Sequence, residues 1–227
     1  MQQYAYMLPL DMRQFFPSID HAILRKTLWR KIQDGRPRGL IDRILASGVG
    51  VLTEAYDMVY FAGDNLLAPL RPRGLPIGNL TSQFWANCYM HPFDLFVTRE
   101  LGCGAYLRYV DDLLLFGNDK QELWQWKQAI IERLATMRLT IHYASAEVKP
   151  TNHGVRFLGF VVYPDYRLLL RRKGINYQRH LKRLLNDYRA QKLDRARVQA
   201  SIEGWLNHTR YGDTWGLRRA MLREVRL

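Results

Sequence analysis

Apolar runs lie on both sides of Asp111 and Asp112, within 105–117, and predict two short buried strands with the aspartates at the turn between them. Residues 6–16 predict another strand, which delivers Asp11 at its end. An Asp-Asp turn is common in any β protein, so an ordinary hairpin would give the same pattern.

Apolar residues recur at helical spacing elsewhere and predict a series of helices. The first begins at 17–20, with Ser18 as a candidate N-cap, and can end at Gly35. Further helices are predicted at 39–49, 81–90, 92–100 and 123–137. Three more short helices are predicted near the C-terminal end, each from one stripe of apolar residues at helical spacing. The stripes are Leu181, Leu184, Leu185 and Tyr188; Val198, Ile202, Trp205 and Leu206; and Leu217, Met221 and Val225.

The order of these elements predicts an α+β fold, with a small antiparallel sheet backed by helices at 1–166 and a helical domain at 167–227. The 227 residues can bury a substantial core, and 48% of them are hydrophobic, which excludes a wholly disordered chain. Cys88 and Cys103 make no disulfide framework and no zinc site, so a cytoplasmic location is expected. The sequence has no signal peptide and no long uncharged apolar run, so neither secretion nor membrane insertion is supported.

Positive charge is concentrated at the C-terminal end. The net charge is +13, and 167–227 holds 16 Lys and Arg against 5 Asp and Glu. A strongly basic C-terminal segment after a nearly neutral N-terminal part is suited to binding the phosphate backbone of a nucleic acid. The alternative is a solvent-exposed helical face with surplus arginine. The candidate nucleic-acid-binding residues are Arg171, Arg172, Lys173, Arg179, Lys182 and Arg183.

The adjacent carboxylates of Asp111 and Asp112 repel each other unless a cation neutralises them, and a hard divalent ion is their natural partner. Asp11 beside them would give three carboxylates, enough for two Mg²⁺ ions about 3.5–4 Å apart, the arrangement used for phosphoryl transfer in polymerases. The alternative is that Asp11 belongs to a turn without a catalytic role.

Four segments together resemble the motifs of reverse transcriptases. In chain order, 11–21 resembles that family's first catalytic motif, 73–83 its template and nucleotide-binding motif, 109–112 its catalytic hairpin and 157–160 its primer grip. The four follow the family order and are highly specific together, although each alone is weak. The resemblance implies a polymerase palm with part of the fingers in the first predicted domain and a basic thumb in the second.

The resemblance also implies an RNA-directed DNA polymerase that uses an RNA template, a DNA or RNA primer, dNTPs and two Mg²⁺ ions, or Mn²⁺ in their place. Asp11 and Asp111 would bridge the ions, Asp112 would be secondary, and the Met12 carbonyl could also coordinate. Phe16 stands where the family has a steric gate against the ribose 2′-hydroxyl; an ordinary core phenylalanine is the alternative. The other implied contacts are nucleotide binding by Ile77, Gly78, Ser82, Gln83, Tyr109 and Lys149, and a primer grip at Leu158 and Gly159.

Ile77 and Gln83 narrow the resemblance to one group of reverse transcriptases. Most group II intron and retroviral enzymes have Gln and Pro at these positions, whereas Ile-Gly-x-x-x-Ser-Gln and the tail 201–219 are similar to the enzymes of diversity-generating retroelements. The resemblance to that group implies copying with frequent errors opposite adenine and a small basic accessory protein as partner.

Two departures from the family leave other functions open. Relatives carry an N-terminal fingers segment that holds the triphosphate, and only ten residues precede Asp11 here. Relatives also have a lysine near residue 145, for which the nearest candidate is Lys149. The alternative to an active polymerase is a fingers-less, catalytically weak subunit that binds RNA–DNA duplex or docks a fingers-bearing chain.

Overall fold

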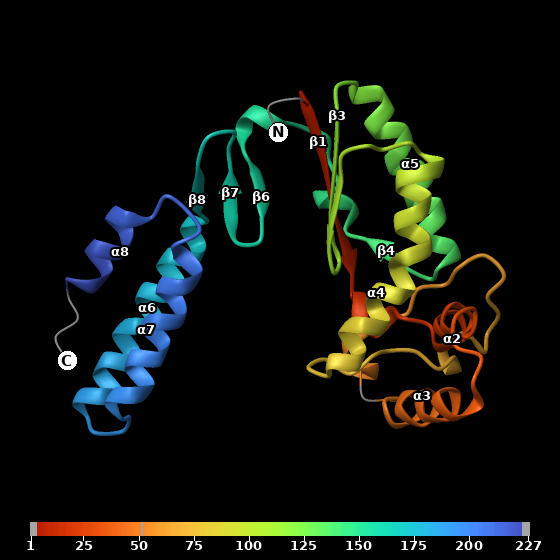
Figure 1. The fold of residues 1–227 in the computed structure, drawn as a ribbon, viewed down its shortest axis with the longest axis horizontal. Helices are drawn as coiled ribbons and strands as arrows, with labels where there is room; N and C mark the ends of the chain where they lie inside the picture. Colours follow the sequence, from red (N-terminus) through yellow and green to blue (C-terminus); the bar gives the residue numbers. More distant parts are fainter. Residues whose placement is uncertain (1–3, 51, 224–227) are drawn as a thin grey trace. The chain divides into compact units, whose positions relative to one another are not determined.

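The computed structural model describes residues 4–50 and 52–223, which form two compact units that divide between Lys149 and Pro150 (Figure 1). We call Tyr4–Lys149 the N-terminal unit and the described residues from Pro150 onward the C-terminal unit. The predicted domains 1–166 and 167–227 are defined by their expected roles in nucleic-acid synthesis, and that division stays a prediction. No helix in the described part of the chain is long and apolar enough to cross a membrane.

An antiparallel sheet forms the centre of the N-terminal unit. Its strands run in the order β2-β3-β1-β4, and β5 also pairs with β1. In the pairing of β1 with β3, Tyr6 lies opposite Gly117 and Asp11 opposite Asp112. The strands are β1 (Tyr6–Arg13), β2 (Tyr106–Tyr109), β3 (Asp112–Gly117), β4 (Thr140–Ile141) and β5 (Lys149–Pro150).

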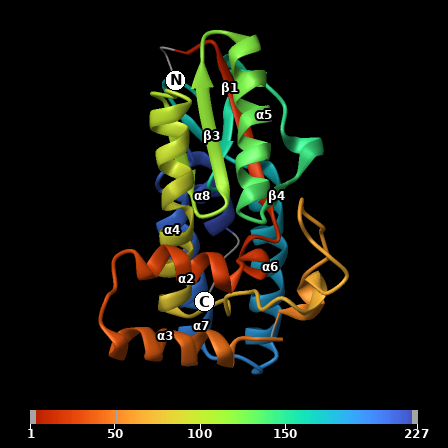
Figure 2. The same ribbon diagram turned by 90° about the vertical axis from the view of Figure 1, so that its right-hand side faces the viewer.

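Helices α4 (Leu80–Leu95) and α5 (Lys120–Thr136) lie on one face of this sheet (Figures 1 and 2). They bury a core in which Leu8 and Leu115 of the sheet and Tyr89 of α4 are fully covered. This core confirms the predicted helices at 81–90 and 123–137 and the predicted mixture of sheet and helices. The other helical segments are α1 (Phe15–Ser18), α2 (His21–Trp29), α3 (Gly35–Ser47), the 3-10 turns Thr53–Ala55, Ala68–Leu70 and Tyr143–Ser145, and the π-helical turn Phe96–Glu100 after α4.

The structure corrects two predicted helix boundaries. Ser18 ends α1 and does not cap the following helix; instead, Asp20 caps α2 by accepting hydrogen bonds from two backbone N–H groups of its first turn, at 2.8 and 3.1 Å. Gly35 does not end that helix, because α2 stops at Trp29 and Gly35 begins α3, with Asp34 as its N-cap.

The C-terminal unit combines a small sheet with three helices. After a 3-10 turn at Thr151–His153, the antiparallel strands β6 (Val155–Phe157), β7 (Phe160–Val162) and β8 (Arg167–Leu169) precede α6 (Arg171–Arg189), α7 (Arg195–Thr209) and α8 (Trp215–Leu222). Helices α6 and α7 lie side by side, and the Tyr177 ring stacks on Trp205 at 4.6 Å between ring centroids (Figure 1). These elements confirm the three predicted C-terminal helices; Leu217 of the third is exposed, and Val225 lies outside the described residues.

Candidate active site

The β2–β3 turn brings the three predicted aspartates together. Strand β2 ends at Tyr109 and β3 begins at Asp112, so Asp111 is in the turn. Antiparallel pairing sets Asp11 opposite Asp112, and the Met12 N–H donates a hydrogen bond to the Asp111 carbonyl oxygen at 3.2 Å. Segments distant in the sequence therefore meet at one end of the sheet.

The negative charges of these aspartates repel one another. Partial burial raises the pKa of Asp11, and the negative charge of Asp111 raises it further, against a lowering by His142. Burial also raises the pKa of Asp112, followed by the charges of Asp11 and Asp111. The aspartates are thus close enough to repel one another and would be stabilised by a nearby cation.

The chemistry of this donor set fits a hard divalent ion, because carboxylate oxygens are the ligands that Mg²⁺ prefers. Within 4–50 and 52–223, however, no group of three or more His, Cys, Asp or Glu side chains is arranged to hold a metal ion. The backbone therefore brings the aspartates together without arranging their side chains as a ligand set, and the metal site stays a prediction. A coordinating role of the Met12 carbonyl is likewise a prediction.

His142 is a neighbour of the site that the sequence did not reveal. Its backbone N–H donates to the Asp11 carbonyl oxygen at 2.9 Å, and its side chain is exposed. Because it follows the two-residue strand β4, its position depends on a long-range pairing with β1 that no local pattern indicates.

Residues of the first and second motifs are tied by three hydrogen bonds. The Gly74 N–H donates to the Ile19 carbonyl at 2.9 Å, and the Leu75 N–H donates to the Phe16 carbonyl at 3.0 Å. The His21 Nε2 lies 2.7 Å from the Gly74 carbonyl oxygen. The candidate steric gate and the start of the candidate nucleotide-binding loop therefore hold each other in place.

The candidate nucleotide-binding side chains differ in their exposure. Ile77 is 70% exposed and Tyr109 is 55% exposed, whereas Ser82 is buried. Phe16 is half-buried, and Lys149 is an exposed residue that lies 3.5 Å from the Glu147 carboxylate. Gly78 and Gln83 are exposed as well, and the nucleotide contacts of this set stay predictions.

The candidate primer grip is the tight turn between β6 and β7. Leu158 and Gly159 both have positive φ, at 49° and 87°, and Leu158 is 45% exposed. A Cβ at Gly159 would lie 3.4 Å from Nε2 of His208, whose ring also contacts Phe160. The turn is thereby fixed against α7 within the same unit.

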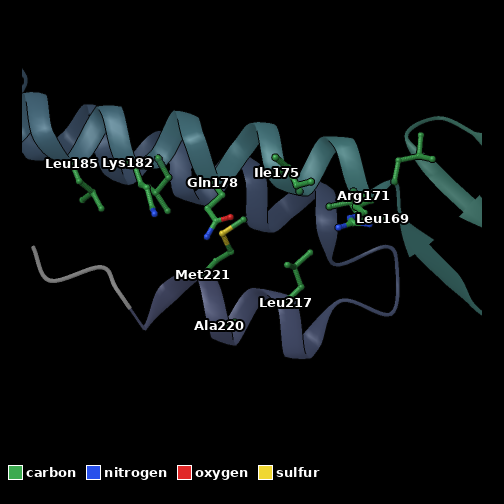
Figure 3. A pocket seen from close by; sticks show the side chains of 12 residues that line it. Leu169, Arg171, Ile175, Gln178, Lys182, Leu185, Leu217, Ala220 and Met221 are labelled. Carbon is green, nitrogen blue, oxygen red and sulfur yellow. The ribbon is translucent and has the colours of Figure 1, made fainter.

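Helix α6 presents the predicted basic surface. An apolar groove of about 330 Å³ runs between α6 and α8, and Arg171 and Lys182 are among its lining residues (Figure 3). The six candidate nucleic-acid-binding residues are all exposed: Arg171, Arg172, Lys173, Arg179, Lys182 and Arg183. Their contact with nucleic acid stays a prediction.

Comparison with known families gives a match over the first part of the chain. Residues 1–162 match the family described as reverse transcriptase (RNA-dependent DNA polymerase). The match includes the β2–β3 turn, β1 and the turn at Leu158 and Gly159. A comparison with curated proteins found no match.

Proposed function

Because this chain belongs to the reverse transcriptase (RNA-dependent DNA polymerase) family, we propose that it adds dNTPs to the 3′-hydroxyl of a DNA or RNA primer on an RNA template. Family membership supports nucleotidyltransferase activity in general, and with it the binding of template and primer. The observation that carries the proposal for this chain is the meeting of Asp11, Asp111 and Asp112 at one end of the sheet.

Asp11 and Asp111 would be the main ligands of two divalent ions, and Asp112 would have a secondary role. When bound, Mg²⁺ or Mn²⁺ would make the primer hydroxyl a better nucleophile and neutralise the departing pyrophosphate. The remaining chemistry is positioning, which supplies most of the rate enhancement in phosphoryl transfer. The turn conformation and the bond from Met12 N–H to Asp111 would position the carboxylates.

Other residues would select and orient the substrates. The Phe16 ring would exclude a ribose 2′-hydroxyl, and Ile77 would contact the nucleotide through apolar atoms alone. Lys149 is the candidate donor of a proton to pyrophosphate. Leu158 and Gly159 would hold the primer, and the basic residues of α6 would bind the duplex backbone.

We further propose that the enzyme is error-prone and of the diversity-generating retroelement type, acts in the cytoplasm and has a small basic accessory protein as partner. The support is Ile77, where accurate relatives have a glutamine that can hydrogen-bond, together with Gln83 and the tail 201–219. The high exposure of Ile77 is compatible with direct contact to a nucleotide.

A second candidate function is a weakly active subunit that docks a fingers-bearing chain. The observation that favours it is a set of exposed apolar side chains in and after the loop before α4. Leu66 is 91% exposed, Leu80 is 83% exposed and Leu70 is 78% exposed, so three large apolar side chains of this segment face solvent.

Primer extension tests the polymerase proposal. The parent chain is given a defined RNA template, a DNA primer, dNTPs and Mg²⁺, and is compared with Asp111→Asn, which keeps the side-chain shape but removes the charge. We expect extension by the parent and a loss of at least about 100-fold in the variant, with unchanged duplex binding. Equal extension by both proteins would refute the assignment of the site. If the parent alone extends no primer but does so once a fingers-bearing chain is added, the second candidate function would be favoured.

A further inference from the structure

The residue before Asp111 has an unfavourable backbone conformation. Val110 has φ of 58°, in the left-handed region that β-branched residues rarely adopt. It is the first central residue of the β2–β3 turn, where a positive φ usually calls for glycine. Such strain persists only where the surrounding structure imposes it, so other contacts must hold this turn in place.

Arg108 makes contacts that can hold it. Its Nη1 donates to the Val110 carbonyl oxygen at 3.2 Å and to Asn87 Oδ1 at 3.1 Å. Its Nε and Nη2 donate to the two carboxylate oxygens of Asp94 at 2.8 and 2.7 Å. Tyr106 adds a bond from its hydroxyl to Asp94 Oδ1 at 2.9 Å. The guanidinium thus joins the strained turn to α4, the helix that carries Asn87 and Asp94.

This network is partly shielded from water, and its Asn87 is exposed. The Arg108 side chain is 12% exposed and that of Asp94 is 27% exposed. The two-pronged geometry needs the planar guanidinium, since a lysine ammonium cannot bond both carboxylate oxygens and the turn carbonyl in the same way. The neighbouring Met12–Asp111 bond secures the other side of the turn.

We propose that Arg108 is a positioning residue for the reaction, which fixes the Val110–Asp111 turn from α4 and so sets the direction of the Asp111 carboxylate. Arg108 acts through the Val110 carbonyl and does not contact the substrates. The proposal rests on the polymerase function proposed above. Without the guanidinium, Val110 would relax toward negative φ and Asp111 would move with it.

The test compares Arg108→Gln and Arg108→Lys with the parent. We expect kcat for primer extension to fall about 10- to 100-fold in Arg108→Gln, because displacing a reacting group by about 1 Å has effects of this size. The KM for dNTP and the affinity for duplex should stay nearly unchanged. Arg108→Lys should resemble Arg108→Gln, because charge alone does not support the turn. Arg25→Gln is the matched control, since Arg25 pairs with Asp42 and bonds to no residue of the turn, and it should keep the parent's kcat.

A second substitution separates positioning from a general loss of structure. Val110→Gly allows the positive φ without strain, so adding it to Arg108→Gln should restore kcat at least about 3-fold, although it adds no contact. Equal kcat in Arg108→Gln and the parent, or a lower kcat in the double variant than in Arg108→Gln, would overturn the proposal.

Amide hydrogen exchange tests the same proposal without activity. Exchange of the Met12 N–H, which is bonded to the Asp111 carbonyl, should be at least about 10-fold faster in Arg108→Gln and unchanged in Arg25→Gln. Unchanged exchange at Met12 would overturn the positioning role even in an inactive protein. Absence of extension by the parent, in contrast, would count against the proposed polymerase function and leave the exchange result to decide the role of Arg108.

Discussion

Replacing His21 with phenylalanine should loosen the link between the first and second motifs. His21 is buried, at 1% exposure, and its Nε2 lies 2.7 Å from the Gly74 carbonyl oxygen, while its Nδ1 is buried without a hydrogen-bond partner among the described residues. The Nε2-protonated tautomer, which donates to Gly74, therefore fits the site. Phenylalanine keeps an aromatic ring, although a slightly larger one, and removes the polar contact to Gly74.

The size of the effect follows from two opposing changes. Leaving the buried Gly74 carbonyl unpaired costs about 1–3 kcal/mol, whereas removing the unpartnered Nδ1 returns a part of that amount. We expect the free energy of unfolding to fall by about 1–2 kcal/mol, which corresponds to a decrease in Tm of about 2–8 °C for a chain of this size. Because Gly74 leads into the loop of Ile77 and Gly78, the KM for dNTP should also rise.

The pH dependence of stability gives an independent check. Burial, and to a lesser degree Arg25, lowers the pKa of His21, against raising effects of the Gly74 carbonyl and Asp20. Below its ordinary pKa of about 6.5, histidine binds more protons in the unfolded chain than in the folded one, so stability falls as the pH falls through this range. His21→Phe removes this contribution and should lose less stability between pH 6.5 and 5 than the parent.

The assays are thermal unfolding at several pH values and steady-state primer extension. The control is His91→Phe, which changes an exposed histidine on α4 and should alter neither Tm nor KM. A parent-like Tm in His21→Phe, with the same pH dependence, would refute the reasoning about the Gly74 bond. An unchanged KM with a lowered Tm would show that the link stabilises the fold without affecting the nucleotide.

Three further outcomes are expected. Asp112→Asn should raise Tm slightly in the absence of divalent ions while reducing extension, because burial and the charges of Asp11 and Asp111 raise the pKa of Asp112; a lowered Tm would contradict this. Replacing Arg171, Arg172 and Lys173 together by glutamine should weaken duplex binding and flatten its salt dependence by up to about three units of slope, and an unchanged slope would remove these residues from the duplex contact. Ile77→Gln should lower the error rate measured by sequencing the DNA product, since shape alone discriminates by only about 1–3 kcal/mol; equally low error rates in both proteins would refute the argument.

The sequence predicted those parts of the fold that depend on local pattern. Apolar runs and turn residues located the strand before Asp11 and the hairpin at Asp111 and Asp112, and helical stripes located α4, α5 and the C-terminal helices. The sequence pattern predicts Ser18 as the cap of the helix after Asp11, whereas the structure shows that Asp20 accepts the backbone hydrogen bonds. Spacing alone cannot distinguish these two residues as caps.

Contacts between distant segments could not be predicted in this way. His142 reaches Asp11 through a two-residue strand, and Arg108 reaches Asp94 on α4 through a geometry that depends on the whole unit. A basic residue in a strand next to an apolar pattern gives no sign of its partner. The candidate aspartates were recognisable because the chemistry requires several carboxylates together, whereas a positioning residue has no such signature.

The turn at Leu158 and Gly159 has a consequence for exchanging parts between relatives. This turn packs on His208, and Pro150 onward forms one compact unit, so the candidate primer-holding turn and the basic helices share a single folded body. A chimaera joined between 166 and 167 would take the turn from one parent and its supporting helix from the other. If the first parent had a side chain larger than glycine at 159, that side chain would meet a residue at 208 that did not evolve with it. A junction between Lys149 and Pro150 transfers the turn with its own support, which makes this peptide bond the natural boundary for grafting a new duplex-binding module.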